Sequence, residues 1–581
     1  MTFAKLVQHK RVRIALVSFS LVAGFLWLSG GSFDPSPPES SWSSSTQVSH
    51  PIDNVIRTAQ ILHARAFTEE TNNLEDGSLA YRRRRGRHPP PGFDKWYESA
   101  LQSDAVIVES FFDQIYEDLE PFWGMQPLDI RGALADWKTT IRIRNGKIED
   151  APREDFRSFV WVEMLREVSS VLPDMDIPVN PLDEPRLLVP WHEIDALTTK
   201  ASRQREHMMS LPLEGFSNTL GKLTSEKSSR TKSHRWITQG DMWPYILSTC
   251  NPWRHKLSHD HNAAPTANWT DYKDICANPE WARAHGSIIN PASMSVSTKL
   301  VPIFSATKLQ GNNDILLPPA SYFADGATYS GVDELGDPGN AIPWSNKTTG
   351  LVWRGKATGG IIQESTWESF HRQRLVSMLN SSDASLWYND TSYLWPADVK
   401  SGQQEHRDQG ALSEWLEDIA NAGLTDLICA PEEQPCQAMA SRYKVAAPVP
   451  MRQQYRWKYL PDIDGNSLSG RFRAFLKSNS SPMKATVFKE WHDSRLMPWV
   501  HFIPLDITLK DLWHTAAYFM GFPGVDPHDQ EGEGIASEGR DWADKVLRKE
   551  DMLLYVHRLL LEYSRITNDG RDRLGYVDDI R

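Results

Sequence analysis

The sequence predicts an α/β protein with open parallel sheets, and three observations lead to this class. Strand-like apolar segments alternate with segments of helical periodicity through the second half of the chain. Two of these strands run directly into basic, glycine-containing stretches that precede a helix. The 581 residues are enough to bury two sizeable cores. Ligands of such sheets bind at the carboxyl ends of the strands, where both basic junctions are expected.

The first residues predict a membrane anchor. Residues 14–33 are uncharged and mostly apolar. The segment before them, residues 1–13, is basic, with Lys5, Lys10, Arg11 and Arg13. About twenty such residues suffice to span a bilayer, and the basic flank keeps residues 1–13 in the cytoplasm. A cleaved signal peptide is the alternative interpretation.

Residues 34–91 are rich in serine, proline and arginine, which predicts a disordered stem that buries no core. The run Arg82–Arg87 is typical of a solvated linker, with a proteolytic processing site as the alternative. The ordered part of the chain is expected from residue 92, where Phe93, Trp96 and Tyr97 supply aromatic anchors.

Four cysteines fall into two local pairs, Cys250 with Cys276 and Cys429 with Cys436. In a lumenal protein this even, close spacing favours two disulfides. The same compartment would permit N-glycans at the sequons Asn268, Asn346, Asn380 and Asn389. The formal net charge of −12 argues against nucleic acid as a partner.

The first basic junction follows a strand beginning near Leu351 and contains Arg354, Gly355 and Lys356. Small residues come next, and a helix is expected over 363–379. Arginine grips phosphate oxygens through paired hydrogen bonds, and glycine allows close approach of the backbone. The junction therefore predicts one side of an anion site.

The second junction follows a strand at 459–463 and a turn at Asp464–Gly465. A helix is expected to open near Ser469, with Arg471 in its first turn. The N-terminus of a helix presents free N–H groups and a partial positive charge, which suit phosphate. Together the two junctions predict an anionic ligand held from two sides, and a nucleotide diphosphate is the expected ligand.

The order of several segments resembles glycosyltransferase family 90, the capsule-associated or Rumi-type enzymes. The resemblance covers roughly residues 150–565. It is carried by Leu172–Pro185, Phe304–Lys308, Asn313–Pro319, Arg456–Gly465, Ser469–Arg473, Lys484–Trp491 and Pro498–Leu505. It implies a GT-B-like fold, in which two Rossmann-like lobes face a cleft. The N-terminal lobe, expected over 92–345, would bind the acceptor, and the C-terminal lobe, expected over 346–581, would bind the nucleotide sugar.

The resemblance also implies roles for particular residues. Arg354 and Arg471 match the arginines that bind the diphosphate in the family, and Lys356 and Arg473 would assist them, with a plain surface position as the alternative for both. The remaining residues expected to bind the nucleotide sugar are Gly355, Ser469, Gly470 and Glu490. The Glu490 carboxylate would accept hydrogen bonds from the ribose hydroxyls. Asp183 lies in the loop that carries the catalytic base in the relatives, although its spacing alone indicates a turn residue.

The implied enzyme is an inverting, UDP-sugar-dependent glycosyltransferase. No tightly bound cofactor is expected, and no metal is required. The D-x-D patterns Asp174–Asp176 and Asp462–Asp464 keep metal dependence as the alternative. Overall length looks closest to fungal β-1,2-xylosyltransferase-type members, which favours xylose as the donor sugar and glucose next.

The expected partners are a UDP-sugar donor and a glycan, glycolipid or glycoprotein acceptor. The expected location is the Golgi membrane, single-pass type II with a lumenal catalytic region, and the endoplasmic reticulum is the alternative. A protein O-glucosyl- or xylosyltransferase is the same-class alternative. An inactive protein that binds glycans or nucleotides is the alternative of another class.

Overall fold

The computed structural model describes residues 50–580 apart from 153–154, 211–233, 254–264, 325–329, 337–341, 364–365, 384–385, 388–408 and 429–433. Residues from His50 onward form one compact unit. The predicted tail at 1–13 and anchor at 14–33 lie outside the described residues. In the part of the chain that is described, no helix is both long and apolar enough to cross a membrane.

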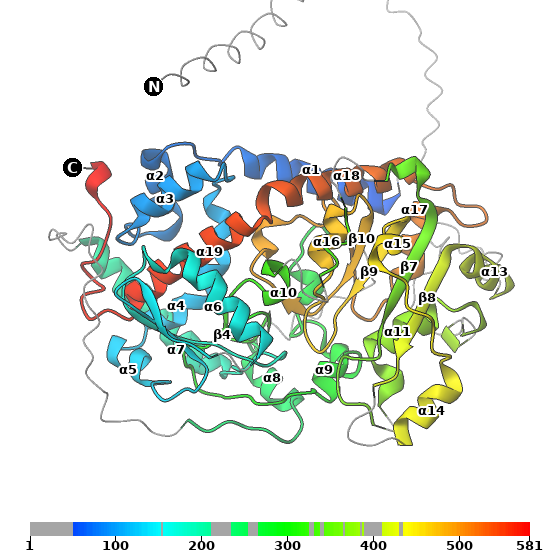
Figure 1. The fold of residues 1–581 in the computed structure, drawn as a ribbon, viewed down its shortest axis with the longest axis horizontal. Coiled ribbons are helices and arrows are strands. Elements are labelled where there is room, and N and C mark those ends of the chain that lie inside the picture. The colour runs from blue at the N-terminus through cyan, green and yellow to red at the C-terminus, as the bar shows by residue number, and fades with distance from the viewer. Residues whose placement is uncertain are drawn as a thin grey trace, which may run out of the picture. The chain divides into compact units, whose positions relative to one another are not determined.

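A five-stranded parallel sheet forms the centre of the second half of the chain (Figure 1). Its strand order is β12-β10-β9-β7-β8, and all neighbours are parallel. The strands are β7 (Thr348–Lys356), β8 (Ala420–Asp426), β9 (Trp457–Ile463), β10 (Ser481–Ala485) and β12 (Ile503–Leu505). Asp462 of β9 and Lys484 of β10 are register partners, and their 3.0 Å ion pair lets both charges be buried. The sheet confirms the α/β class.

Helices connect and cover these strands. They are α11 (His371–Met378), α13 (Gln409–Ile419), α14 (Gln434–Arg442), α15 (Met451–Gln454), α16 (Phe472–Lys477), α17 (Leu512–Met520) and α18 (Asp529–Val546). The helix predicted over 363–379 begins only at His371, because Gly359 and Gly360 take positive φ angles of 121° and 145° and bend the chain first. The helix expected near Ser469 begins at Phe472 and has six residues.

The first half is built differently from the expected Rossmann-like lobe. Its three-stranded sheet has the order β2-β1-β3 and is antiparallel throughout. The strands are β1 (Thr140–Arg144), β2 (Lys147–Asp150) and β3 (Met175–Pro178), and α6 (Phe156–Ser169) lies between β2 and β3 in the chain. The short β4 (Phe304–Ser305) and β6 (Ile315–Leu316) pair in parallel, and β4 reaches β3 through a bridge between Val179 and Phe304. Among the described strands, the GT-B pattern of two doubly wound sheets is therefore absent.

Two elements tie the halves together. The last long helix, α19 (Lys549–Ile566), belongs to the buried core of the first half, where Leu559 and Tyr563 cluster with Trp96 and Ile177. In the opposite direction, β11 (Phe488–Lys489) pairs antiparallel with β5 (Lys308–Leu309). The C-terminal lobe expected over 346–581 thus includes a helix that packs on the other half.

Residues 50–91 are largely helical, which corrects the prediction of a disordered stem for this part of 34–91, while residues 34–49 lie outside the described residues. Residues 50–91 contain α1 (Pro51–Phe67) and α2 (Leu74–Arg85), followed by α3 (Phe93–Gln102). Ile52 and Ile56 of α1 are buried in the core that surrounds the parallel sheet, whereas Tyr81 of α2 is buried in the core of the first half. The expected aromatic anchors Phe93, Trp96 and Tyr97 are all buried there as well.

Three arginines of the run at the end of α2 form ion pairs, whereas Arg83 is exposed. Arg82 forms an ion pair with Asp579 at 2.6 Å, and Arg84 forms one with Asp113. Arg85 binds Glu109 at 2.8 Å, and Arg558 of α19 binds the same carboxylate at 3.1 Å. Carboxylates from distant parts of the chain form these ion pairs. The prediction of a solvated linker, which was based on composition alone, is therefore wrong for this segment.

Cys250 and Cys276 form the predicted disulfide, with Cα atoms 5.5 Å apart. Cys436 is also disulfide-bonded, and its predicted partner Cys429 lies outside the described residues. The sequon asparagines Asn268 and Asn346 are exposed, and Asn380 is half-buried. Asn389 is outside the described residues, and glycosylation of all four stays a prediction.

Candidate active site

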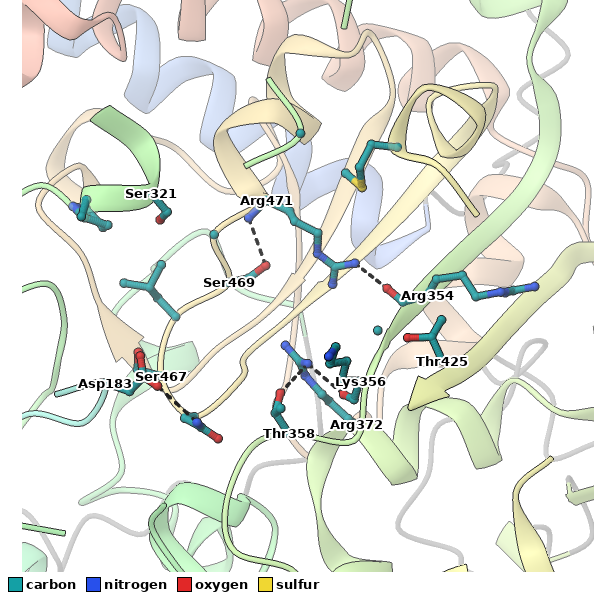
Figure 2. A pocket seen from close by; sticks show the side chains of 18 of the residues that line it. Asp183, Ser321, Arg354, Lys356, Thr358, Arg372, Thr425, Ser467, Ser469 and Arg471 are labelled. Atoms are coloured by element: carbon teal, nitrogen blue, oxygen red, sulfur yellow. Dashed lines mark hydrogen bonds between the residues drawn. The ribbon is translucent and has the colours of Figure 1, made fainter. Parts of the chain in front are cut away.

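A cavity of about 1080 Å³ opens at the carboxyl ends of β7 and β9. Both halves of the chain line it, since Asp183 and Ser321 from the first half lie opposite Arg354 and Arg471 from the second (Figure 2). Its size suits a ligand as large as a nucleotide sugar, and its position is the usual one for ligands of parallel sheets.

Arg471 reaches into this cavity from the loop after β9. Its guanidinium donates a 2.7 Å hydrogen bond to the carbonyl oxygen of Arg354 and lies 5.7 Å from the ring centre of Trp353. Burial lowers the pKa of Arg471, although Asp462 opposes the shift. The predicted arginine therefore does reach the cavity.

Arg372, which the sequence did not single out, reaches the same space from α11 (Figure 2). Its side chain donates to the carbonyl oxygens of Asp464 at 2.7 Å and Lys356 at 3.0 Å, and to the Thr358 hydroxyl at 2.7 Å. Burial, followed by the charge of Arg471, lowers its pKa to about 9. Arg372 also lies beside Trp353, 5.8 Å from the ring centre.

The two guanidiniums form a site that favours a negatively charged ligand. Neither Arg372 nor Arg471 pairs with a carboxylate anywhere in the described residues. Both guanidiniums are half-buried, and partly desolvated positive charges are costly when no carboxylate contacts them. The nearby charges of Asp462 and Asp464 offset part of this cost, but the two guanidiniums also repel each other. An anion bound between them would supply a counter-charge, and a diphosphate offers oxygens to both.

Arg354 lines the cavity, but its guanidinium turns towards β8. It donates to the backbone oxygen of Asn421 at 2.7 Å, to the amide oxygen of the same residue at 2.6 Å, and to the Ala447 carbonyl at 3.1 Å. Burial lowers its pKa. The Arg354 carbonyl, rather than its side chain, faces Arg471. Arg354 and Arg372 both line the cavity, and the diphosphate-binding role of Arg354 stays a prediction.

The neighbours of Arg354 are the last residues of β7 rather than part of a turn. Lys356 is exposed and forms an ion pair with Asp426 at 3.2 Å, while its carbonyl holds Arg372. Gly355 lines the cavity, and a Cβ atom there would come within 2.7 Å of the Trp353 ring. Glycine is therefore required for the packing of Trp353.

The loop before α16 brings Ser469 and Gly470 to the cavity as predicted. The backbone N–H of Arg471 donates to the Ser469 hydroxyl at 3.5 Å. The Tyr322 hydroxyl donates a 3.0 Å hydrogen bond to the backbone carbonyl of Ser469. These contacts fix the loop that carries Arg471.

Arg473 and Glu490 do not line the cavity. Arg473 is buried and donates to the backbone oxygens of Leu547 at 2.7 Å and Tyr322 at 2.9 Å. Glu490 is fully buried, 3.3 Å from Lys484. Burial raises the pKa of Glu490, but Lys484 and His492 outweigh it and hold the pKa at about 2. Both residues are buried outside the lining of the cavity, whereas the acids Asp333 and Glu334 do line it.

Asp183 lines the cavity from the first half, and other side chains hold both of its oxygens. Arg157 of α6 forms an ion pair with Oδ1, and the Asn466 amide donates to Oδ2 at 3.2 Å. Asn466 also accepts a 3.0 Å hydrogen bond from the Gly359 N–H through Oδ1. One amide therefore links the carboxylate to the bend after β7. About a third of the Asp183 side chain remains exposed, so an acceptor can reach it.

The D-x-D carboxylates have partners of their own. Asp174 accepts from the Asn145 N–H at 2.6 Å, and Asp176 binds Arg144 at 2.5 Å. Asp464 is fully buried and accepts from the Val487 N–H at 3.0 Å, with His285 3.2 Å away. Within the described ranges, no group of three or more acidic, histidine or cysteine side chains is placed to hold a metal ion.

Comparison with known proteins matches part of the chain to a family. Residues 287–569 match the model of "Glycosyl transferase family 90". This segment is a glycosyltransferase family 90 domain. The family 90 domain contains β7 to β12, Arg372 and Arg471, whereas Asp183 and Arg157 precede it.

Curated relatives resemble parts of this domain at low identity. Protein O-glucosyltransferase 2 of Danio rerio is 27% identical over 113 residues, which are 19% of this chain and 21% of the relative. Protein O-glucosyltransferase 3 of Rattus norvegicus is 25% identical over 132 residues, 22% of this chain and 25% of the relative. Protein O-glucosyltransferase 1 of the same species is 29% identical over 113 residues, 19% of this chain and 27% of the relative. The chain thus matches about a quarter of the length of these relatives, and closeness to fungal xylosyltransferases stays a prediction.

Proposed function

We propose that this protein is an inverting glycosyltransferase that transfers a sugar from a UDP-sugar to a hydroxyl group. The observation that carries the proposal is the pair of guanidiniums, Arg372 and Arg471, which face a large cavity without carboxylate partners in the described residues. Across the same cavity lies Asp183, a carboxylate held in place and partly exposed. The family 90 domain supports the same class of reaction.

In the proposed reaction, Asp183 takes the proton of the acceptor hydroxyl, and the acceptor oxygen bonds to the anomeric carbon. The bond between that carbon and the diphosphate oxygen breaks, and UDP leaves with the electron pair. Arg372 and Arg471 stabilise the negative charge that develops on the diphosphate, without any need for a metal ion. Attack from the face opposite UDP inverts the anomeric centre. In place of Glu490, which the sequence favoured, Asp333 or Glu334 accepts the hydrogen bonds of the ribose hydroxyls, because both acids line the cavity.

The sequence favours xylose as the transferred sugar, and the names of the curated relatives give support to glucose. A glycan, glycolipid or glycoprotein is the proposed acceptor, and the Golgi membrane is the proposed location. A second candidate, transfer of glucose or xylose to a hydroxyl of a folded protein module, is supported by those same names.

The test incubates residues 50–581 with a panel of UDP-sugars, with glycoside and protein-module acceptors, in the presence and absence of EDTA. We expect UDP release from UDP-xylose or UDP-glucose that survives EDTA and falls at least about 100-fold in Asp183→Asn, because general-base catalysis contributes that much. UDP binding by the variant should be unchanged. Activity lost to EDTA would contradict the metal-free reaction, and UDP binding without turnover of any donor would favour an inactive binding protein.

A further inference from the structure

An exposed aromatic ring lies on the acceptor side of the cavity. Phe156, the first residue of α6, lines the cavity and is 46% exposed. A ring left this open forgoes much of the stabilisation that burial would bring. Nothing in the proposed donor chemistry uses it, because the diphosphate is held by Arg372 and Arg471.

The same helix carries this ring and the arginine that binds the proposed base. The Asp155 side chain caps α6 by accepting a 2.9 Å hydrogen bond from the Ser158 N–H, and Trp161 on the same helix is fully buried. The next residue after Phe156 is Arg157, which binds Asp183 and the Pro181 carbonyl, the latter at 3.1 Å. The ring and the carboxylate therefore share one rigid support.

The other groups on this side of the cavity are polar. Asp183 and Arg157 lie there with Asn466, whose amide contacts Asp183, and Ser321 lines the same cavity. One aromatic face combined with hydrogen-bonding groups complements a pyranose ring, which has an apolar C–H face and a rim of hydroxyls. A flexible peptide hydroxyl would need the base but not the ring.

We propose that Phe156 is the platform on which the acceptor sugar stacks, so that the attacking hydroxyl belongs to a sugar ring. This inference rests on the proposed transferase function and assigns its acceptor to the class of glycans. Phe156 is a specificity-determining residue, because it touches the acceptor and not the diphosphate.

The test measures acceptor KM with methyl glycosides of mannose, glucose and galactose in Phe156→Ala, Phe156→Trp and Phe159→Ala. Phe159 is the matched control, because it lies one turn further along α6 and is 49% exposed but does not line the cavity. We expect KM to rise roughly tenfold in Phe156→Ala, as for the loss of one good contact. KM should stay near the wild-type value in Phe159→Ala and return towards it in Phe156→Trp. UDP release without acceptor should not change in any variant.

Three results would overturn the proposal. KM could be the same in Phe156→Ala and Phe159→Ala, or acceptor-free UDP release could fall together with transfer, which would assign Phe156 to the donor. Transfer only to protein modules, insensitive to Phe156→Ala, would select the protein acceptor.

Failure of the proposed transferase function can be distinguished from failure of the proposed sugar-binding role of Phe156. If the wild-type protein turns over no donor, saturation-transfer NMR with the same glycosides tests the platform directly. A signal present in wild type and Phe159→Ala but lost in Phe156→Ala supports the sugar seat, and no wild-type signal overturns it.

Discussion

At the scale of single residues, the chemistry of the cavity depends on where each charge finds its partner. Arg372 and Arg471 contact only uncharged groups in the described residues, whereas Lys484 meets Asp462 and Glu490. Equally basic residues therefore differ in what they can offer a ligand. The first two are available to an anion, and the third is neutralised within the protein.

The first prediction concerns the diphosphate. Arg372→Lys keeps the charge but loses the planar group that binds two oxygens at once. We expect the Kd for UDP, measured by calorimetry, to rise at least about tenfold, because hydrogen bonds between charged groups contribute about 1.5–3 kcal/mol each. Arg473→Lys is the control, since Arg473 contacts backbone oxygens outside the cavity. An unchanged Kd in Arg372→Lys would show that the diphosphate lies elsewhere.

The second prediction concerns Asn466, which holds one oxygen of Asp183. Asn466→Ala should leave the carboxylate anchored only by Arg157, and misplacement of a base slows proton transfer. We expect kcat to fall about tenfold while the Kd for UDP changes less than twofold. Ser467→Ala in the same loop is the control. A Kd that rises as much as kcat falls would instead assign Asn466 to the donor side.

Part of the site could be predicted from the sequence, because strand-to-helix junctions and family motifs are local. Ser469, Gly470, Arg471 and Asp183 all line the cavity. Arg372 was missed because it follows a bend at Gly359 and Gly360 that displaces the helix from its expected start. The Glu490 carboxylate can be buried because it pairs with Lys484. The position of Lys484 is set by the pairing of β9 and β10, which cannot be predicted from the residues of either strand alone.

At the scale of elements, the parallel sheet was predictable and the N-terminal helices were not. The strands around the two junctions carry their own apolar and turn signals, and β7 and β9 lie where those signals indicate. The serine- and proline-rich composition behind the predicted stem lies mostly in residues 34–49 of the sequence, and the arginine run extended that prediction to residue 91. α2 is nevertheless held by Asp113, Glu109 and Asp579 from other elements. Long-range partners of this kind leave no mark in the local sequence.

The third prediction follows from this arrangement. A fragment beginning at residue 50 should fold, whereas one beginning at residue 88 loses α1 and α2 and leaves Glu109 and Arg558 without Arg85. Removing one member of a buried ion pair costs about 3–5 kcal/mol. We expect the shorter fragment to lose Tm by at least about 5 °C or to aggregate, as thermal melts would show. Equal Tm values would mean that both helices are dispensable.

At the scale of the whole molecule, stability should depend on pH through a pair of neighbouring acids, of which Asp511 is buried and Asp506 half-buried. Asp506 and Asp511 lie together after β12, where the Asp506 N–H donates to Asp511 at 3.2 Å. Burial, reinforced by Asp506, raises the pKa of Asp511 to about 8, and Tyr272 is close to the same carboxyl. A raised pKa means that folding favours the protonated form. Its stabilising contribution is complete below the unfolded value of 3.8 and is lost as pH rises through about 8.

The fourth prediction is that Asp511→Asn removes this penalty. Each pKa unit corresponds to about 1.4 kcal/mol, so the variant should exceed wild type in unfolding free energy by at least about 1.4 kcal/mol at pH 8. The difference should shrink steadily towards pH 4. Urea unfolding at several pH values measures it, with the exposed Asp541→Asn as control. A difference independent of pH would exclude Asp511 as its source.

The pairing of Arg82, Arg84 and Arg85 also decides when this protein can be cut. An endoprotease that recognises consecutive arginines needs them extended and accessible in its own active site, but here they form the last turn of α2 and their side chains are bound to carboxylates. Arg83 and Arg84 are exposed, so the helical backbone and these ion pairs, rather than burial, keep the run from a protease until α2 unwinds. Cleavage at this point would discard misfolded copies and spare those that have completed folding.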